Sequence, residues 1–217
     1  MRNTLLAVGT LFLSMFFMGS AYALDVQITP ELPSVDVMHE GKKVTIMRNQ
    51  DTANTINPDY AKTSRKCPPF CIRPIKIAEG VETLGELEMI HYVKMKSDGV
   101  DNIVVIDSRT PDWVAKGTIP GSINIPWTKL SPAKGASFFE IAGILQKQFG
   151  VIEEEGGLMN FSKAKTLVMF CNGMWCGQSP RNILQLLKIG YPAEKIKWYR
   201  GGMQNWETLG LATVKPK

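Results

Sequence analysis

The residues in this chain best suited to covalent chemistry are four cysteines, which fall into two close pairs. Cys171 and Cys176 lie within the segment CNGMWCGQS, and Cys67 and Cys71 flank the segment PPF. A cysteine reacts as its thiolate, which a helix N-terminus or inward-pointing backbone N–H groups stabilise. Two cysteines can instead form a disulfide where their Cα atoms approach within about 7 Å. The chemistry of each pair therefore depends on the elements around it.

Cys171 directly follows the apolar run 166–170, which is typical of a strand buried on both faces. In open parallel sheets, reactive groups gather where strands end and helices begin. We expect Ser179 to be the N-cap of the next helix and Pro180 its first residue. This position favours a reactive Cys171, held as a thiolate or a persulfide, over an inert core cysteine.

Alternating strand and helix patterns surround this loop. The wholly apolar run 103–106 predicts a strand, and 166–170 and 196–199 are interpreted as two more. The spacing of apolar residues predicts four helices. The first opens with a capping box at 83–86, and its inward residues are Leu87, Ile90 and Val93. The second has Phe138, Ile141, Ala142, Leu145 and Phe149 inward, and the other two span 181–189 and 203–209. This alternation implies an α/β fold in which helices flank a parallel sheet. Two runs of alternating polarity, at 34–39 and 43–48, predict an N-terminal β-hairpin.

The N-terminus has the pattern of a secretory signal. Arg2 precedes the apolar run 5–18, and Ala-Tyr-Ala predicts cleavage after Ala23. The run is shorter than the ~20 residues of a membrane span, so we expect a periplasmic protein with no membrane attachment after cleavage. We divide the chain into a signal peptide at 1–23, an N-terminal extension with the hairpin and the CPPFC linker at 24–80, and the α/β domain at 81–217.

Composition excludes several classes of protein. Hydrophobic residues make up 44% of the 217 residues, so the chain is neither disordered nor collagen-like. Lysine and arginine exceed aspartate and glutamate by 25 to 20, a formal charge of +5. Because no dense basic cluster accompanies this excess, we expect no nucleic-acid partner.

The stretch from about 81 to 214 resembles a rhodanese (sulfurtransferase) domain. Four segments carry the resemblance: IVVIDSR at 103–109, GTIPGSINIP at 117–126, the loop 171–179, and YRGGMQNW at 199–206. The resemblance implies the rhodanese-like sheet and a cysteine, here Cys171, that takes sulfane sulfur from a donor and passes it to a thiol or cyanide. It also implies that Asp107 and Arg109 support the site from the neighbouring strand. Thr118 stands where the family usually has histidine.

The loop departs from the family pattern in length and charge. It is two residues longer than usual and contains no arginine, which disfavours thiosulfate as a donor because a dianion favours a nearby guanidinium group. Phosphatase relatives of this fold use a Cys-x5-Arg motif, in which the arginine binds the phosphoryl oxygens. Gly177 occupies that arginine position here, which disfavours phosphatase activity. The residues expected to contact substrate are Asn172, Gly173, Met174, Trp175, Gly177, Gln178 and Ser179, with Arg181 in the first helical turn as a substitute guanidinium.

Cys176 leaves three interpretations open. It resolves a persulfide or sulfenate on Cys171 by forming a disulfide, it forms a static disulfide with Cys171, or it is an unreactive thiol packed beside Trp175. For Cys67 and Cys71 we favour a structural disulfide over a second redox pair, because the chain is expected to be exported. A zinc site from all four cysteines is disfavoured, since the usual Cys-x2-Cys spacing is absent.

The sequence thus predicts a periplasmic sulfurtransferase or sulfur carrier that uses a persulfide on Cys171. The alternatives are a thiol–disulfide oxidoreductase using Cys171 and Cys176, and a binding module that keeps the fold without turnover. No metal or organic cofactor is expected. The expected partners are a small sulfur donor or a thiol acceptor, and the acceptor includes a cysteine of a partner protein.

Overall fold

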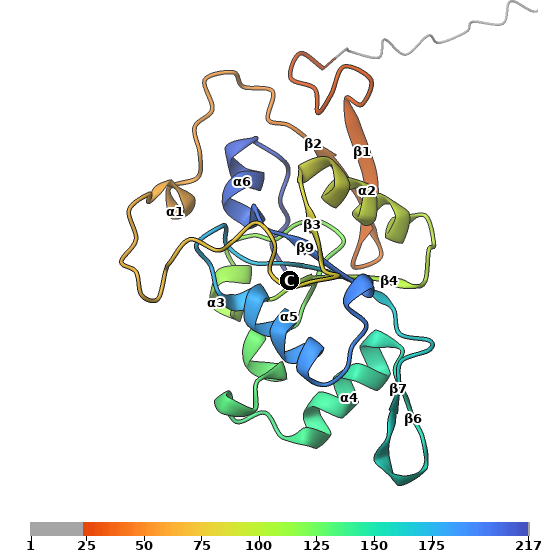
Figure 1. Ribbon diagram of the computed structural model, residues 1–217. Helices are drawn as coiled ribbons and strands as arrows, with labels where there is room; N and C mark the ends of the chain where they lie inside the picture. The colour runs from red at the N-terminus through yellow and green to blue at the C-terminus, as the bar shows by residue number, and fades with distance from the viewer. Residues whose placement is uncertain (1–23, 217) are drawn as a thin grey trace, which may run out of the picture.

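A five-stranded parallel sheet forms the centre of the computed structural model, which describes residues 24–216. The signal peptide expected at 1–23 lies outside the described residues. The strand order is β3 (Glu82–Leu84), β9 (Ile196–Tyr199), β8 (Thr166–Phe170), β4 (Ile103–Asp107) and β5 (Ile123–Asn124). Helices cover both faces of this sheet (Figure 1), which confirms the predicted α/β fold.

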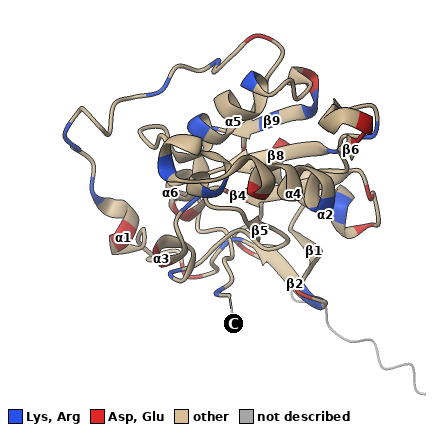
Figure 2. Ribbon diagram, turned by 90° about the horizontal axis from the view of Figure 1, so that it is seen from below, with Lys and Arg blue, Asp and Glu red and all other residues tan. Residues whose placement is uncertain are grey.

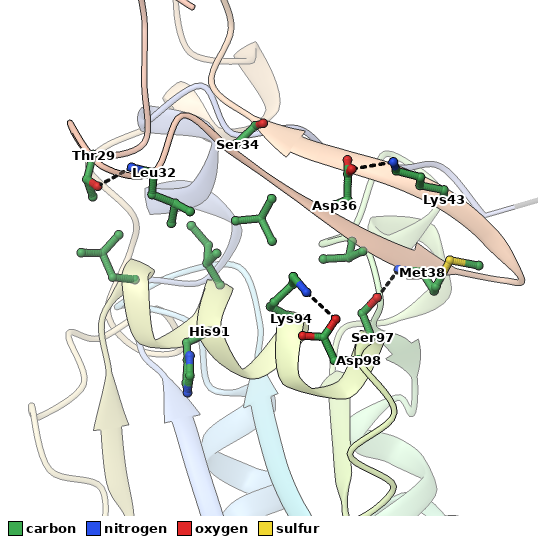
Figure 3. Close-up of a pocket in the computed structure, with 14 residues that line it drawn as sticks. Thr29, Leu32, Ser34, Asp36, Met38, Lys43, His91, Lys94, Ser97 and Asp98 are labelled. Atoms are coloured by element: carbon green, nitrogen blue, oxygen red, sulfur yellow. Dashed lines mark hydrogen bonds and ion pairs between the residues drawn. The ribbon is translucent and has the colours of Figure 1, made fainter.

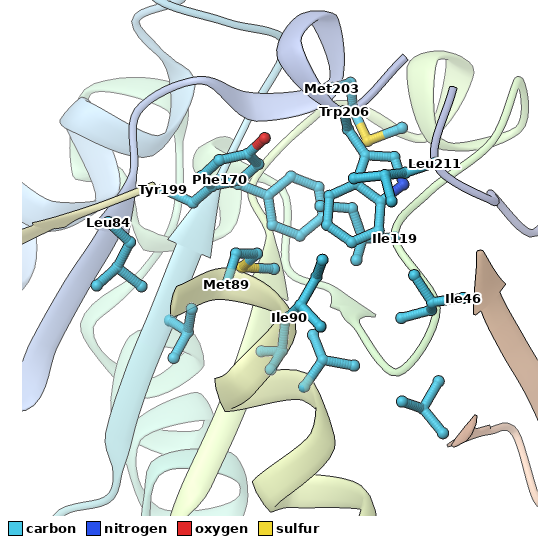
Figure 4. Packing of buried hydrophobic residues seen from close by; sticks show 14 of the residues in the cluster. Ile46, Leu84, Met89, Ile90, Ile119, Phe170, Tyr199, Met203, Trp206 and Leu211 are labelled. Carbon is cyan, nitrogen blue, oxygen red and sulfur yellow. The ribbon is translucent and has the colours of Figure 1, made fainter. Parts of the chain in front are cut away.

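The side chains of the central strands alternate between two core layers. One layer joins Val105, Val168 and Phe170 to α2 (Glu86–Ser97) and α6 (Gly202–Thr208), as Figure 4 shows in part. The other joins Val104, Ile106, Leu167 and Met169 to α4 (Phe138–Phe149) and α5 (Gln178–Lys188). Because both faces are covered, every residue of β4 is buried, as expected for parallel strands with apolar side chains on each side.

The predicted N-terminal β-hairpin is present. β1 (Ser34–His39) pairs antiparallel with β2 (Lys42–Met47) through a tight turn in which Glu40 and Gly41 have φ of 48° and 75°. Positive φ at both central residues matches the twist of paired strands. Val35, Val37 and Ile46 are buried in the same hydrophobic cluster as α2. The hairpin therefore shares a core with the sheet.

The segment between β2 and β3 runs around the outside of the molecule (Figure 1). Its regular structure is the short helix α1 (Pro58–Ala61), as expected for a polar, proline-marked stretch. Further short elements in the described part of the chain are α3 (Pro111–Val114), a small hairpin of β6 (Ile152–Glu153) and β7 (Met159–Asn160), and four 3-10 helices. Basic and acidic residues are interspersed along the chain (Figure 2). Within residues 24–216, no helix is long and apolar enough to cross a bilayer.

The start of α2 differs from the prediction. Thr83 belongs to β3, and the N-cap is Gly85, whose backbone N–H donates to the Glu88 carboxylate at 3.1 Å. The prediction placed the helix start early because three residues are too few to show a strand pattern. Leu87 is 49% exposed and not inward, whereas Ile90 and Val93 are buried.

Two further helix starts also differ. Phe138 is 62% exposed at the first position of α4, because burial begins one turn later at Ile141. α5 begins at Gln178 with Gly177 as its N-cap, so Ser179 is not the cap and Pro180 is the third helical residue. Proline is tolerated there because the first helical N–H groups have no intrahelical partner. The Ser179 hydroxyl is engaged elsewhere, as described next.

Candidate active site

Cys171 lies directly after the carboxyl end of β8 and is 2% exposed. Ser179, at the start of α5, donates its hydroxyl hydrogen to Cys171 Sγ at 3.1 Å. Trp198 of β9 donates its indole N–H to Ser179 Oγ at 3.1 Å. Since the indole N–H can only donate, Ser179 Oγ accepts it and directs its own hydrogen to the sulfur. Three neighbouring elements therefore orient one hydrogen bond toward Cys171.

The surroundings of Cys171 favour an anionic sulfur. Burial by itself raises the pKa of a thiol, but hydrogen bonds from the Cys176 thiol, from the Ser179 hydroxyl and from backbone N–H groups outweigh it. Together they lower the pKa of Cys171 to about 7. The same pairing and burial raise the pKa of Cys176 well above its ordinary value, so Cys176 stays protonated and donates. Of the two, Cys171 is therefore the one that ionises first as pH rises.

Both cysteines of the loop are free thiols in the structure. Cys176 is 3% exposed, and its Sγ lies 3.6 Å from Gln178 Oε1. Its single S–H hydrogen therefore has two alternative acceptors, Gln178 Oε1 and the Cys171 sulfur. Asn172 and Gly173 are buried beside Cys171, Met174 is 38% exposed, and Arg181 is exposed on α5. The residues predicted to contact substrate are therefore spread over both sides of the loop.

Backbone hydrogen bonds from α6 hold the cysteine loop in place. The backbone N–H groups of Met203 and Gln204 each donate at 2.9 Å, to the carbonyl oxygens of Cys171 and Asn172 respectively. Gly202 precedes them with φ of 57°, and a Cβ there would lie 2.3 Å from the Cys171 carbonyl oxygen. Only glycine combines this conformation with so close a contact. The Gly-Gly pair therefore sets the position of the cysteine loop.

Asp107 and Arg109 form a fully buried ion pair at 2.6 Å at the end of β4. Arg109 also donates to the Tyr60 hydroxyl at 2.7 Å, to Asn172 Oδ1 at 3.4 Å and to the Gly117 carbonyl oxygen, while Thr118 donates to Asp107 at 2.7 Å. Every donor of the guanidinium group is therefore matched, as a buried charge requires. Burial raises the pKa of Tyr60 to about 12, so its hydroxyl stays neutral.

The N-terminal extension covers the other side of the loop. Cys67 and Cys71 are joined by a disulfide, and Phe70 between them contacts Trp175 edge-to-face at 5.6 Å between ring centroids. The Arg73 backbone N–H donates to the Met174 carbonyl oxygen at 2.8 Å. Arg200 in turn donates to the Arg73 carbonyl oxygen at 2.7 Å. The extension is therefore bonded to the loop and to the turn after β9.

The family model of the rhodanese-like domain matches residues 91–209. The chain belongs to this family. The matched range begins inside α2 and ends just after α6, so it contains the cysteine loop, and it confirms the resemblance seen in the sequence. No curated protein sequence matches the chain.

Three solved structures similar to this rhodanese-like chain are the following. The Wolinella succinogenes polysulfide-sulfur transferase homodimer is 21% identical, with 65% of this chain and 83% of that chain covered and a TM-score of 0.40. The Pseudomonas aeruginosa thiosulfate sulfurtransferase is 16% identical, with 63% of this chain and 21% of that chain covered and a TM-score of 0.41. A Rhodopseudomonas palustris protein of unknown function, described as a possible tyrosine phosphatase, is 20% identical, with 64% of this chain and 88% of that chain covered and a TM-score of 0.41. These likenesses concern the fold alone.

A large cavity lies away from the rhodanese-like cysteine loop. It measures about 870 Å³ and lies between β1 and α2 (Figure 3). Asp36 pairs with Lys43 and Lys94 with Asp98 along its edges. The Met38 backbone N–H donates to Ser97 Oγ at 2.8 Å. It holds no cysteine, so we assign the reaction to the loop despite the cavity's size. Within residues 24–216, no cluster of three or more His, Cys, Asp or Glu side chains is arranged to hold a metal ion.

Sequence reasoning missed several residues that surround the cysteine loop of this rhodanese-like domain. They are Tyr60, Arg65, Phe70 and Arg73 of the extension, and Trp198 of β9. The extension residues lie about a hundred positions before Cys171, in a stretch without periodicity. The absence of an arginine from the cysteine loop was the one sequence signal for these residues. It indicated that any guanidinium group near Cys171 would have to come from another part of the chain.

Proposed function

We propose that this protein is a periplasmic sulfurtransferase that carries sulfane sulfur as a persulfide on Cys171. The observation that supports it is the set of hydrogen-bond donors around the Cys171 sulfur, which lowers its pKa to about 7. The same donors would stabilise the terminal sulfur of a persulfide anion, since they are placed before the reaction and exclude water. A lowered pKa makes the thiolate available near neutral pH.

Two displacements move the sulfur. The Cys171 thiolate attacks the sulfane sulfur of a donor X–S⁻, and X leaves with the electron pair of the bond that breaks. Cys171 then carries –S–S⁻, and the total charge is unchanged. An acceptor thiolate attacks the outer sulfur, takes it as a persulfide and returns the Cys171 thiolate. The partners implied are a small sulfur donor and a thiol acceptor, which is a small molecule or a cysteine of another protein.

The second candidate function is thiol–disulfide exchange, which the contact between the Cys171 thiolate and the Cys176 thiol favours. A partner disulfide would oxidise the pair by accepting two electrons and the Cys176 proton, leaving a Cys171–Cys176 disulfide, one partner thiol and one partner thiolate. A non-catalytic binding module is the third candidate. It would have no reactive Cys171.

Intact-protein mass spectrometry after exposure to thiosulfate or polysulfide distinguishes these candidates. We expect a gain of one sulfur atom that is absent from Cys171→Ser and retained in Cys176→Ser, its matched control. A reversible loss of two hydrogens that needs both cysteines would favour the oxidoreductase instead. If neither change occurs and Cys171 resists alkylation in the folded protein, the binding module is the correct interpretation.

Export is tested separately. We expect the mature protein in the periplasmic fraction of a bacterial host, with Leu24 as its N-terminal residue by Edman sequencing. A protein that keeps its first residues and stays in the cytoplasmic fraction would contradict the proposed location.

A further inference from the structure

A small cavity of about 200 Å³ lies beside Cys176, between the cysteine loop and the extension. Three arginines line it, Arg65 and Arg73 from the extension and Arg181 from α5, together with four aromatic side chains. None of its lining residues is acidic. Its volume is below the ~300 Å³ at which drug-sized pockets begin, so it suits a small ligand.

Aromatic rings hold two of the arginines by their flat faces. The guanidinium carbon of Arg65 lies 3.8 Å from the ring centroid of Trp175, and that of Arg181 lies 4.7 Å from the ring centroid of Trp127. Arg73 packs so closely on Gly177 that a Cβ there would lie 2.6 Å from Arg73 Nη2. A guanidinium group stacked on its face keeps its N–H edge free to bind two oxygens of an anion.

The charges of these arginines are not compensated. Within the described part of the chain, no carboxylate oxygen lies within 4.0 Å of any of their guanidinium nitrogens. The Nε atoms of Arg65 and Arg73 are buried and have no hydrogen-bond partner. Buried donors without acceptors are unfavourable, and three like charges around one small cavity produce a positive potential. An anion in the cavity would neutralise this potential by binding the guanidinium N–H groups that face it.

We propose that this cavity binds a small oxyanion through Arg65, Arg73 and Arg181, and that the oxyanion is the charged group of the sulfur donor. The part that concerns the donor rests on the proposed function. The extension then supplies the guanidinium groups that the cysteine loop lacks. The oxyanion is either a free inorganic ion or a sulfonate-like group at the end of an organic molecule, for which the aromatic walls provide an apolar surface.

The test uses the full mature chain with Cys171→Ser, so that binding is measured without sulfur transfer. Sulfate and benzenesulfonate are titrated separately at constant ionic strength, and tryptophan fluorescence is followed. We expect saturable binding of at least one of them. Arg65→Gln and Arg73→Gln should each raise its Kd about tenfold or more, because each removes charge-assisted hydrogen bonds. Lys66→Gln, an equal change of charge at the neighbouring exposed residue, should leave the Kd unchanged.

Each outcome has one meaning. Binding of sulfate alone identifies an inorganic oxyanion, binding of benzenesulfonate alone identifies an organic one, and both support the site. Absence of saturable binding, or an equal effect of Lys66→Gln and the arginine variants, overturns it. If the anion binds but Cys171 gains no sulfur from any donor, the proposed function fails while the anion site stands. If sulfur transfer occurs and Arg65→Gln binds anions normally, the anion site alone is wrong.

Discussion

Replacing Ser179 with alanine tests the origin of the low Cys171 pKa. The variant removes the hydroxyl that donates to Cys171 Sγ at 3.1 Å and leaves the fold of α5 intact. A hydrogen bond to a charged group contributes about 1.5–3 kcal/mol, and 1.36 kcal/mol corresponds to about one pKa unit. We therefore expect the pKa of Cys171 to rise from about 7 by about 1–2 units. At neutral pH the thiolate fraction would fall from about one half to about one tenth or less.

The assay is a pH titration of the ultraviolet absorbance of the thiolate, in which Cys171→Ser identifies the Cys171 contribution. Ser108→Ala is the matched control, because Ser108 is equally buried and its hydroxyl has no hydrogen-bond partner. The control should titrate like the parent protein. Urea unfolding is measured alongside, since Ser179→Ala leaves the Trp198 indole N–H buried without an acceptor, at a cost of about 1–3 kcal/mol.

One result would refute the reasoning. If folded Ser179→Ala titrates at the same pH as the parent and as Ser108→Ala, the hydroxyl does not stabilise the thiolate. The low pKa would then come from the backbone N–H groups and Cys176 alone.

Four further predictions follow from the same site. Cys176→Ala should raise the pKa of Cys171 in this titration, whereas Cys176→Ser should keep it low because the serine hydroxyl still donates. Gly202→Ala should lower the free energy of unfolding by at least about 2 kcal/mol in urea, and more than Gly41→Ala, which has positive φ but no atom within 4 Å of its Cβ position. Arg109→Met should lower it by about 3–5 kcal/mol by leaving a buried carboxylate unpaired. Because folding lowers the pKa of Cys171, stability should rise from pH 7 toward the unfolded thiol's pKa near ~8.5, and this rise should be absent in Cys171→Ser.

The sheet was predictable because burial on both faces leaves a simple mark in the sequence. The runs 103–106 and 167–170 are wholly apolar, and both lie in central strands. Helix starts were less predictable, since a start depends on which residue binds the free N–H groups. At Ser179 the hydroxyl is bonded to Cys171 and Trp198, and the competition between capping and that bond is invisible in sequence.

The position of Cys171 followed from topology, but the groups that act on it did not. Trp198 fits a core position and also donates an N–H, so packing alone accounts for its presence in the sequence. Arg65 and Arg73 lie in a polar stretch whose path is set by contacts with Met174 and Trp175. Such contacts join distant segments and leave no local periodicity to detect.

Access to Cys171 is the feature that connects the loop, the extension and the choice of reaction. The carbonyl oxygens of Cys171 and Asn172 are bonded to α6, and Arg109 holds Asn172 from the side of β4. The arginine-lined cavity has Asn172 and Cys176 in its walls, whereas Cys171 is 2% exposed and does not line it, so a donor bound there would reach Cys171 past Cys176. A donor that enters there meets Cys176 beside Cys171, so a bound oxyanion would fix which sulfur atom faces the thiolate. Because Cys176 stays protonated, it would donate to the reacting sulfur and not compete with it as a nucleophile.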